Sequence, residues 1–273
     1  MKTVFIEKSL GMDIREESIS LTLVGKNLRT IEVLAGKTIA LKPLTGKDEK
    51  AEKHFLNKVN RFLIDYDTWP ESVVVSLPRS YVTFKTFELP APDMESVRSM
   101  VEFELERQFS SGLEDLYFTF QVTPKAENIF HVASAAIKKE IANYYLELVQ
   151  KLNLKTTILD VSTFANVNLA FSQEIENDSP IWTLVDISPE TLDIALIKND
   201  AIEFSRCLNW ARPAIKDANS GKISDPAQLE KLSRETTKSI VDELQQALSS
   251  CRSIEANELI GHIFVTGGEV LVP

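Results

Sequence analysis

The amino-acid sequence predicts an α/β protein that contains the same structural unit twice. The segment MDIREESISLTLV at 12–24 is repeated as VDISPETLDIALI at 185–197, which is 173 positions downstream. Asp13 then matches Asp186, and the residues that follow alternate between apolar and polar in the same register. Strand-like runs also alternate with amphipathic helical segments along the chain, which is typical of α/β proteins. We therefore expect a duplicated fold rather than two apolar runs that match by chance.

Length and charge narrow the classes of protein and partner. Hydrophobic residues make up 44% of the 273 residues, which indicates a soluble globular chain of about two domains. The 30 basic and 40 acidic residues give a formal net charge of −10. Phosphate backbones and anionic lipid surfaces repel such a chain, so we expect no nucleic-acid partner and no direct polybasic binding to a membrane.

Three further features concern the compartment. The sequence has no run of about 18 apolar residues, so no segment is expected to span a bilayer. Glu7 and Lys8 interrupt the N-terminal segment, which therefore lacks the apolar core of a signal peptide. Cys207 and Cys251 stand alone and far apart, which favours free thiols in a reducing cytoplasm over a disulfide or redox pair.

Strands are predicted where short runs are rich in β-branched or aromatic residues and are bounded by Gly, Pro, Asn or Asp. These runs are Thr3–Ile6, Ser18–Val24, Arg29–Leu34, Val73–Leu77, Val82–Leu89, Tyr117–Val122, Ile129–Ala135, Thr156–Asp160, Ile181–Ile187, Leu192–Ile197, Ala201–Arg206 and His262–Thr266. Each half of the chain begins with three such runs followed by a helix. The order of the predicted elements is therefore repeated, as the segment 12–24 is.

Four amphipathic segments predict helices whose apolar faces belong to the core. The first carries apolar residues at helical spacing over Phe55–Tyr66, and the third does so over Ile141–Leu152. The second begins after Asp93, a plausible N-cap, and reaches Phe109. The fourth and longest begins at Pro226 and continues to Cys251. The polar segment between the last strands and this helix, 211–226, is expected to be a mobile surface loop.

Several motifs together resemble a known family. An acidic residue at a strand end, then a tight turn into a second strand, once in each half, resembles the actin and Hsp70 ATPase superfamily. The middle of the chain resembles the insert of the type IV pilus assembly protein PilM and the cytoplasmic domain of its type II secretion counterpart, GspL. The matching motifs are Glu88–Leu89–Pro90 at a strand end, Glu102–Phe103–Glu104 in a helix, and the strand stretch 113–122. The resemblance covers essentially the whole chain.

This resemblance implies an actin-like fold, that is, a duplicated ribonuclease H-like fold with a small inserted α/β domain. Subdomain I would comprise 1–75 and 155–178, the insert 76–154, and subdomain II 179–273. The strands that begin at Ser18 and Leu192 should then hold the same place in their respective sheets. A helix follows the final glycine motif in the family, so we expect the 273 residues to be a C-terminally truncated fragment.

The resemblance also implies where a nucleotide would lie. In the superfamily the two turns hold the phosphates of ATP, the aspartates organise metal and water, and paired glycines let the base approach the backbone. The matching positions in this chain are Asp13, Ser18, Asp186, Thr191, Gly267 and Gly268. We interpret them as a vestigial nucleotide site.

Both turns depart from the nucleotide-binding pattern. Arg15 and Ser188 stand where Gly is expected, and Pro189 removes an N–H that could donate to a phosphate oxygen. Glu16 and Glu17 would bring like charge to a triphosphate, a repulsion on the order of 1 kcal/mol or more each. We therefore expect no catalytic residues, no bound cofactor and no ATP hydrolysis. The only cofactor that the resemblance implies is ATP with Mg²⁺, and the residues of these two turns argue against its binding.

The expected function is a non-enzymatic assembly platform at the cytoplasmic face of the bacterial inner membrane. By resemblance, its partners would be an inner-membrane pilus or secretion assembly protein, a secretion or pilus motor ATPase and, in a homodimer, a second copy of the chain. The alternative, from a different functional class, is an active actin-like ATP-binding protein, ATPase or phosphotransferase. The state of the two turns separates the two hypotheses.

A partner surface is expected on the insert and at its seam with subdomain I, where the family binds a short peptide of its membrane partner. The strands there mix aromatic and basic groups, which suits an apolar anchor with a polar rim. The candidate contact residues are Arg79, Tyr81, Phe84, Lys85, Phe87 and Arg98. Two alternatives stay open: the aromatic residues could fill the core of the insert, and the motor ATPase could bind elsewhere.

Other residue types give weaker signals. His54, His131 and His262 are scattered and have no acidic or thiol neighbour at ligand spacing, so we expect no metal site. The acidic helix segment 102–107 could present paired carboxylates, but a solvated helix face is the simpler interpretation.

Overall fold

A computed structural model describes residues 5–44, 48–109, 112–172, 180–188, 190–209, 222–223, 225–251, 258 and 260–267. The chain separates into two compact units. Unit 1 comprises Met1–Tyr81 and Ile137–Ala165, and unit 2 comprises Val82–Ala136 and Asn166–Pro273. Each unit therefore contains more than one segment of the chain, because the middle of the sequence is inserted into the first unit.

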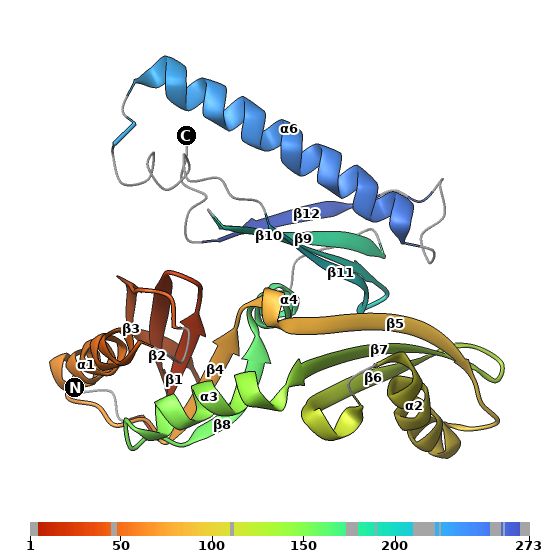
Figure 1. The fold of residues 1–273 in the computed structure, drawn as a ribbon, viewed down its shortest axis with the longest axis horizontal. Helices are drawn as coiled ribbons and strands as arrows, with labels where there is room; N and C mark the ends of the chain where they lie inside the picture. The colour runs from red at the N-terminus through yellow and green to blue at the C-terminus, as the bar shows by residue number, and fades with distance from the viewer. Residues whose placement is uncertain are drawn as a thin grey trace. The chain divides into compact units, whose positions relative to one another are not determined.

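Unit 1 contains a five-stranded sheet with the strand order β3-β2-β1-β4-β8 (Figure 1). Its strands are β1 (Glu7–Ile14), β2 (Ser18–Lys26), β3 (Ile31–Ala40), β4 (Ser72–Leu77) and β8 (Thr156–Val161). Its helices are α1 (Glu49–Asp65), α3 (Lys139–Gln150), the 3-10 turn η1 (Arg79–Tyr81) and the start of α4 (Ser162–Phe171). The strands β1 and β4 are parallel, whereas β1, β2 and β3 pair antiparallel.

The core of unit 1 lies on one face of this sheet. Alternate side chains of β1, such as Leu10 and Met12, point to that face and are buried, as the period of two requires. Helix α1 begins at Asp48, whose carboxylate accepts hydrogen bonds from the first-turn N–H groups of Lys50 and Ala51. Phe55 of α1 and residues of α3 pack on the same core, so both helices cover a single face of the sheet.

Unit 2 contains two sheets (Figure 1). The four-stranded sheet has the order β11-β10-β9-β12 and is formed by β9 (Ile181–Ile187), β10 (Thr191–Lys198), β11 (Ala201–Asn209) and β12 (His262–Thr266). The three-stranded sheet has the order β5-β7-β6 and is formed by β5 (Val82–Pro90), β6 (Leu116–Ala126) and β7 (Ile129–Lys138). The helices are α2 (Met94–Gln108), α6 (Pro226–Ser250) and the 3-10 turn η2 (Leu113–Asp115).

Helices cover both faces of the four-stranded sheet. On one face α6 packs on Val185, Ile194 and Leu196 through Leu244 and Ala247. On the other face Val167 of α4 joins a second cluster. Because both faces are covered, all residues of β9 and most of β10 are buried, and their sequences read as continuous apolar runs. The three-stranded sheet has its own core with α2.

The sheet topology confirms the duplication. In the five-stranded and the four-stranded sheet alike, the first two strands form an antiparallel hairpin, the third strand pairs with the second, and a later strand adds in parallel beside the first. The ladder of β2 and β3 shifts register between Leu23 and Val24, and that of β10 and β11 shifts between Leu196 and Ile197. These shifts fall at matching positions of the repeat, so β2 and β10 hold the same place, as predicted.

Some predicted elements differ from the structure. The first strand was expected at Thr3–Ile6, of which residues 3 and 4 lie outside the described residues. The described strand is Glu7–Ile14, where the chain pairs with β2 and β4. Helix α4 was not predicted, since its small and apolar residues lack a clear polar face. The interval 76–154 proposed for the insert includes α3, which packs into the core of unit 1. Most of the expected loop 211–226 lies outside the described residues.

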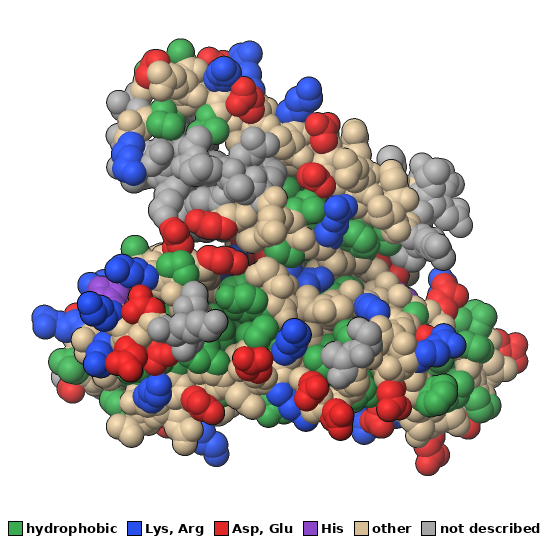
Figure 2. Space-filling model, viewed as in Figure 1, with side chains coloured by type: hydrophobic (Ala, Val, Ile, Leu, Met, Phe, Trp, Pro, Cys, Tyr) green, Lys and Arg blue, Asp and Glu red, His purple; other side chains and the backbone are tan. Residues whose placement is uncertain are grey.

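The surface carries side chains of both charges, as the numbers of acidic and basic residues in the sequence imply. Acidic and basic side chains are interspersed over the face shown in Figure 2, with hydrophobic groups between them. None of the described helices is both long enough and apolar enough to cross a membrane.

Candidate functional site

A row of polar side chains crosses the whole sheet of unit 1. Strand pairing places Thr38 beside Ser20, Ser20 beside Asp13, Asp13 beside Ser76, and Ser76 beside Asp160. Directly paired residues project from the same face of a sheet, so these five form one line, which we call the first polar row. The row lies on the face opposite the core, because Asp13 alternates with the buried core residues of β1.

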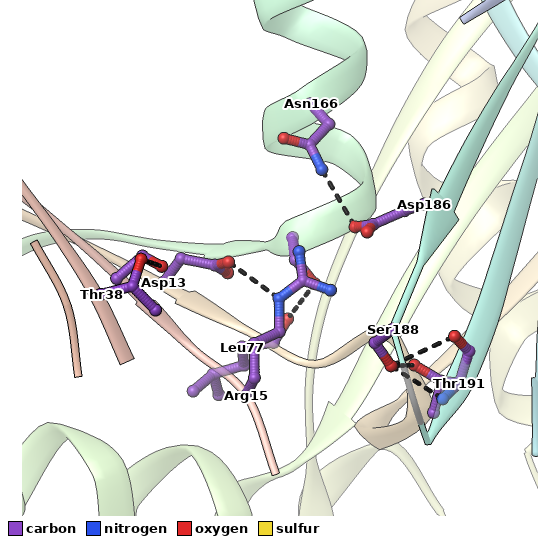
Figure 3. Close-up of polar contacts among 10 residues, drawn as sticks. Asp13, Arg15, Thr38, Leu77, Asn166, Asp186, Ser188 and Thr191 are labelled. Atoms are coloured by element: carbon purple, nitrogen blue, oxygen red, sulfur yellow. Dashed lines mark hydrogen bonds and ion pairs between the residues drawn. The ribbon is translucent and has the colours of Figure 1, made fainter. Parts of the chain in front are cut away.

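Asp13 is held by an internal cation. Nε of Arg15 donates to Oδ2 of Asp13 over 2.8 Å (Figure 3), and the two side chains are 17% and 32% exposed. The other carboxylate oxygen, Oδ1, and Oγ of Ser76 are both buried, and neither has a hydrogen-bond partner among the described residues. The first polar row therefore has one carboxylate oxygen occupied by arginine and two polar atoms available to a ligand or water.

Asp160 closes the first polar row at the edge strand β8. Burial raises the pKa of its carboxyl above the ordinary value, although the N–H of Val161, which donates to Oδ1 over 2.7 Å, acts in the opposite direction. The carboxyl is thus biased toward its neutral form compared with an exposed aspartate.

Unit 2 contains a matching line, the second polar row. Strand pairing places Cys207 beside Asp193, Asp193 beside Asp186, and Asp186 beside Thr266. Asp186 and Asp193 match Asp13 and Ser20 of the repeat, and they are only 1% and 2% exposed. Nδ2 of Asn166, on α4, donates to Oδ2 of Asp186 over 3.0 Å (Figure 3). A buried carboxylate requires such donors, so α4 helps to hold Asp186 in place.

The two β-turns share one backbone hydrogen bond but differ in side-chain chemistry. The N–H of Arg15 donates to the carbonyl of Ser18 over 2.8 Å, and the N–H of Ser188 donates to that of Thr191 over 2.9 Å. In the second turn Oγ of Ser188 also accepts from the N–H of Thr191 over 2.8 Å (Figure 3). The same Oγ accepts from the N–H of Glu190 over 3.2 Å. A serine side chain thus occupies the donors that a phosphate would need. Pro189 lies outside the described residues.

Gly267 has a local structural role. Its φ of +121° is a conformation that L side chains rarely adopt. A Cβ atom there would lie 2.0 Å from the carbonyl oxygen of Ile187, at the end of the neighbouring strand β9. Close approach of two backbones therefore explains this glycine without a nucleotide. Gly268 lies outside the described residues, so the expected contact of both glycines with a base stays a prediction.

The candidate partner residues are divided between the two units. Arg79, at 5% exposure, is buried in unit 1, and Tyr81 stacks on Tyr145 with ring centroids 6.1 Å apart. Arg79 therefore does not offer the surface group that we expected from the sequence.

The other four candidates belong to unit 2. Phe84 is half-buried, and Phe87 packs against the core of the three-stranded sheet. Nζ of Lys85 lies 5.0 Å from the centre of the Phe109 ring and donates to the carbonyl of Gln108. Arg98, on α2, is exposed. Arg98 is therefore the most accessible of the six candidates.

Of the residues in the two polar rows, only Asp13 and Asp186 were assigned to the site from the sequence. Ser76 and Asp160 each stand at or near the end of a predicted strand, and Asp193 matches Ser20 in the repeat. The sequence signal that could have identified these residues was a polar residue at a strand end. It became specific only when strand pairing aligned these positions with Asp13 and Asp186.

Two sheets of matching topology, each with an aspartate near the end of its first strand and a tight turn after it, define a protein of the actin-like fold. The chain belongs to the family of the type IV pilus assembly protein PilM, whose family model matches residues 11–215. This confirms the family that the sequence motifs indicated. No curated protein matches the sequence closely enough to count as a relative.

Solved structures agree on the fold. A PilM–PilN type IV pilus biogenesis complex matches with a TM-score of 0.76 and 19% identity, over 97% of this chain and 82% of that chain. Ethanolamine utilization protein EutJ from Carboxydothermus hydrogenoformans matches with a TM-score of 0.53 and 12% identity, over 99% and 80% of the two chains. The cytoplasmic domain of EpsL from the Vibrio cholerae type II secretion system has a TM-score of 0.47 and 14% identity, over 80% and 76%. This third likeness is too weak to add to the argument.

Proposed function

We propose that the chain is a non-enzymatic assembly platform at the cytoplasmic face of the bacterial inner membrane, in a type IV pilus or type II secretion complex. Membership of the PilM family is the observation that carries this proposal. The shared fold with a PilM–PilN complex supports a PilN-like protein as the membrane partner. A motor ATPase and a second copy of the chain are the further partners that we propose.

The proposal includes the absence of ATP hydrolysis. Arg15 holds one oxygen of Asp13, which is therefore less able to bind Mg²⁺ or a metal-bound water. Oγ of Ser188 accepts the N–H groups of Glu190 and Thr191, so the second turn offers phosphate oxygens fewer donors than a glycine turn would. The residues of the two turns therefore fit a nucleoside triphosphate poorly. In a fold that hosts many functions, a surface that recruits partners then becomes the main functional feature.

One observation favours the alternative, an active actin-like ATP-binding protein, ATPase or phosphotransferase. Oδ1 of Asp13 and Oγ of Ser76 are buried and have no hydrogen-bond partner among the described residues. Because buried polar atoms are nearly always paired, a ligand bound along the first polar row would satisfy both. We place this function second, since it requires phosphates to displace the contacts of Arg15 and Ser188.

We expect the chain to release no phosphate from ATP and to show at most weak nucleotide binding. The measurement is a titration with a fluorescent ATP analogue, with and without Mg²⁺, together with a phosphate-release assay. Asp13→Ala serves as the matched control because it removes the carboxylate of the first turn. Micromolar affinity in the unsubstituted chain that disappears in Asp13→Ala would show that the site is not vestigial.

We expect the chain to bind the cytoplasmic segment of a PilN-like protein, and charge reversal at Arg98 to weaken this binding about tenfold or more if α2 forms part of the contact. Fluorescence anisotropy with a labelled peptide of that segment measures the affinity. Arg107→Glu is the matched control, since Arg107 lies on the same helix and is 73% exposed. An affinity of Arg98→Glu as high as that of the unsubstituted chain would place the contact away from Arg98, and no binding to the unsubstituted chain would refute the proposed partner.

A further inference from the structure

A cavity of about 610 Å³ lies within unit 2, apart from both polar rows. Its walls come from β5 and β7 of the three-stranded sheet, from β11 of the four-stranded sheet, and from the C-terminal end of α6. A hydrogen bond ties the two sheets together at this place, where Oγ1 of Thr86 donates to the carbonyl of Glu203 over 3.1 Å. The cavity is therefore built by two sheets that are in direct contact.

His131 and Glu203 meet in the wall of the cavity without a hydrogen bond. Nε2 of His131 lies 3.6 Å from Oε2 of Glu203, and the two side chains are 9% and 12% exposed. Nε2 is buried and has no hydrogen-bond partner among the described residues. A buried polar atom in this situation calls for a donor or acceptor that the described protein atoms do not supply. Both residues line the cavity, so a ligand there can reach them.

The charges around the cavity leave one carboxylate in excess. Glu88, which also lines it, forms an ion pair with Lys125, and this hydrogen bond raises the pKa of the lysine and keeps it protonated. Lys198 forms an ion pair with Glu258 over 2.8 Å. Glu203 also attracts the Lys125 ammonium electrostatically, and its contact within 4 Å among the described ionisable groups is the imidazole of His131. The carboxylates of Glu88 and Glu203 thus share one lysine, Lys125, which is hydrogen-bonded to Glu88, so one negative charge remains in excess at the cavity.

The remaining walls also suit a cation. Phe87 and Phe204 contribute aromatic rings, whose faces attract cations. Cys251 is the C-cap of α6, and the C-terminal end of a helix carries a partial negative charge. The carboxylate, the aromatic rings and the C-terminal end of the helix therefore all favour a positively charged ligand.

We propose that this cavity binds one guanidinium group, such as that of an arginine side chain of a protein partner. A guanidinium is planar, carries a single positive charge and presents several N–H donors. It can therefore donate to Oε2 of Glu203 and, when Nε2 of His131 carries no proton, to that nitrogen as well, while it lies against a phenyl ring. A metal ion fits less well, because no three His, Cys, Asp or Glu side chains of the described residues converge as ligands. This site is separate from the nucleotide turns and does not depend on the proposed function.

The test is an NMR titration of the isotope-labelled chain with N-acetyl-L-argininamide at about pH 8, where an ordinary imidazole is neutral. We expect saturable shifts of backbone amides in β5, β7 and β11. The matched ligand, N-acetyl-L-citrullinamide, has nearly the same shape without the charge and should bind at least ten times more weakly. Propylguanidine, which carries the guanidinium without peptide groups, distinguishes a small-molecule ligand from an arginine within a chain. We expect N-acetyl-L-argininamide to bind at least as well as propylguanidine.

Substitution locates the site. Glu203→Gln should weaken the binding of N-acetyl-L-argininamide at least tenfold, whereas Glu230→Gln, at an exposed glutamate of α6, should leave it unchanged. Equal binding of the arginine and citrulline compounds to the unsubstituted chain, or no saturable shift around the cavity, would overturn the proposal even if Glu203→Gln fails to fold. Unchanged affinity in a folded Glu203→Gln variant would also overturn it.

Discussion

Replacement of Gly267 by alanine should lower the free energy of unfolding of unit 2 by about 3 kcal/mol or more. Two costs add at this position. The φ of +121° is strained for any residue with a Cβ atom, and that atom would lie 2.0 Å from a backbone oxygen of Ile187. Neither atom of this clash can rotate away, so β12 must separate from β9. Chemical denaturation followed by the fluorescence of Trp182 measures the loss, since this ring lies 5.2 Å from that of Phe264 on β12.

Gly36→Ala is the matched control for this substitution. Gly36 also lies in a strand, but its Cβ would have no neighbour closer than a backbone oxygen at 4.0 Å. We expect its free energy of unfolding to change by no more than about 0.5 kcal/mol. If Gly267→Ala proves as stable as Gly36→Ala, the close approach of β12 to β9 is wrong, and a role of Gly267 in ligand binding becomes the better explanation for the glycine.

Phe55→Ala should destabilise unit 1 by about 3–5 kcal/mol. The Phe55 side chain is fully buried, at 0% exposure, where α1 packs on the sheet. Truncation removes its apolar area from the core and leaves a cavity that the surrounding side chains can fill only in part. The face of the sheet that α1 covers is opposite the first polar row, so a loosened core should also weaken the strand pairing that aligns the row.

Urea denaturation followed by far-ultraviolet circular dichroism measures this effect. Ile64→Ala, on the same helix but 73% exposed, should change the free energy of unfolding by no more than about 0.5 kcal/mol. Because the chain has two compact units, two separate transitions are to be expected, and Phe55→Ala should shift only one of them. A shift no larger than that of Ile64→Ala would contradict the packing of α1 described above.

The sequence by itself determined that the fold is duplicated and where the two copies correspond. A strand has a side-chain period of two, so an alternating pattern repeated in one register must place the same faces toward the core. Asp13 and Asp186 could therefore be matched without a structure, and strand pairing does place them opposite Ser20 and Asp193, which also match in the repeat. The PilM family could likewise be identified from motifs that are local in the chain.

Only the tertiary structure decided the chemistry around these aspartates. The first polar row joins Asp13 to Ser76 and Asp160, residues far apart in the sequence whose alignment depends on how β1, β4 and β8 pair. The sequence pattern also did not predict where the side chains of the two turns point. Arg15 turns back onto Asp13, and the hydroxyl of Ser188 turns onto its own turn.

The burial of the candidate partner residues was likewise decided only by the tertiary structure. Arg79 was expected from the sequence to be a surface cation, yet it is buried in unit 1, whereas Arg98 is exposed. His131 appeared as an isolated histidine, but contact between two sheets places it beside Glu203 in the wall of a cavity. The physical reason is common to these cases: local patterns set the backbone period, whereas the charge and hydrogen bonding at a site depend on which distant strands become neighbours.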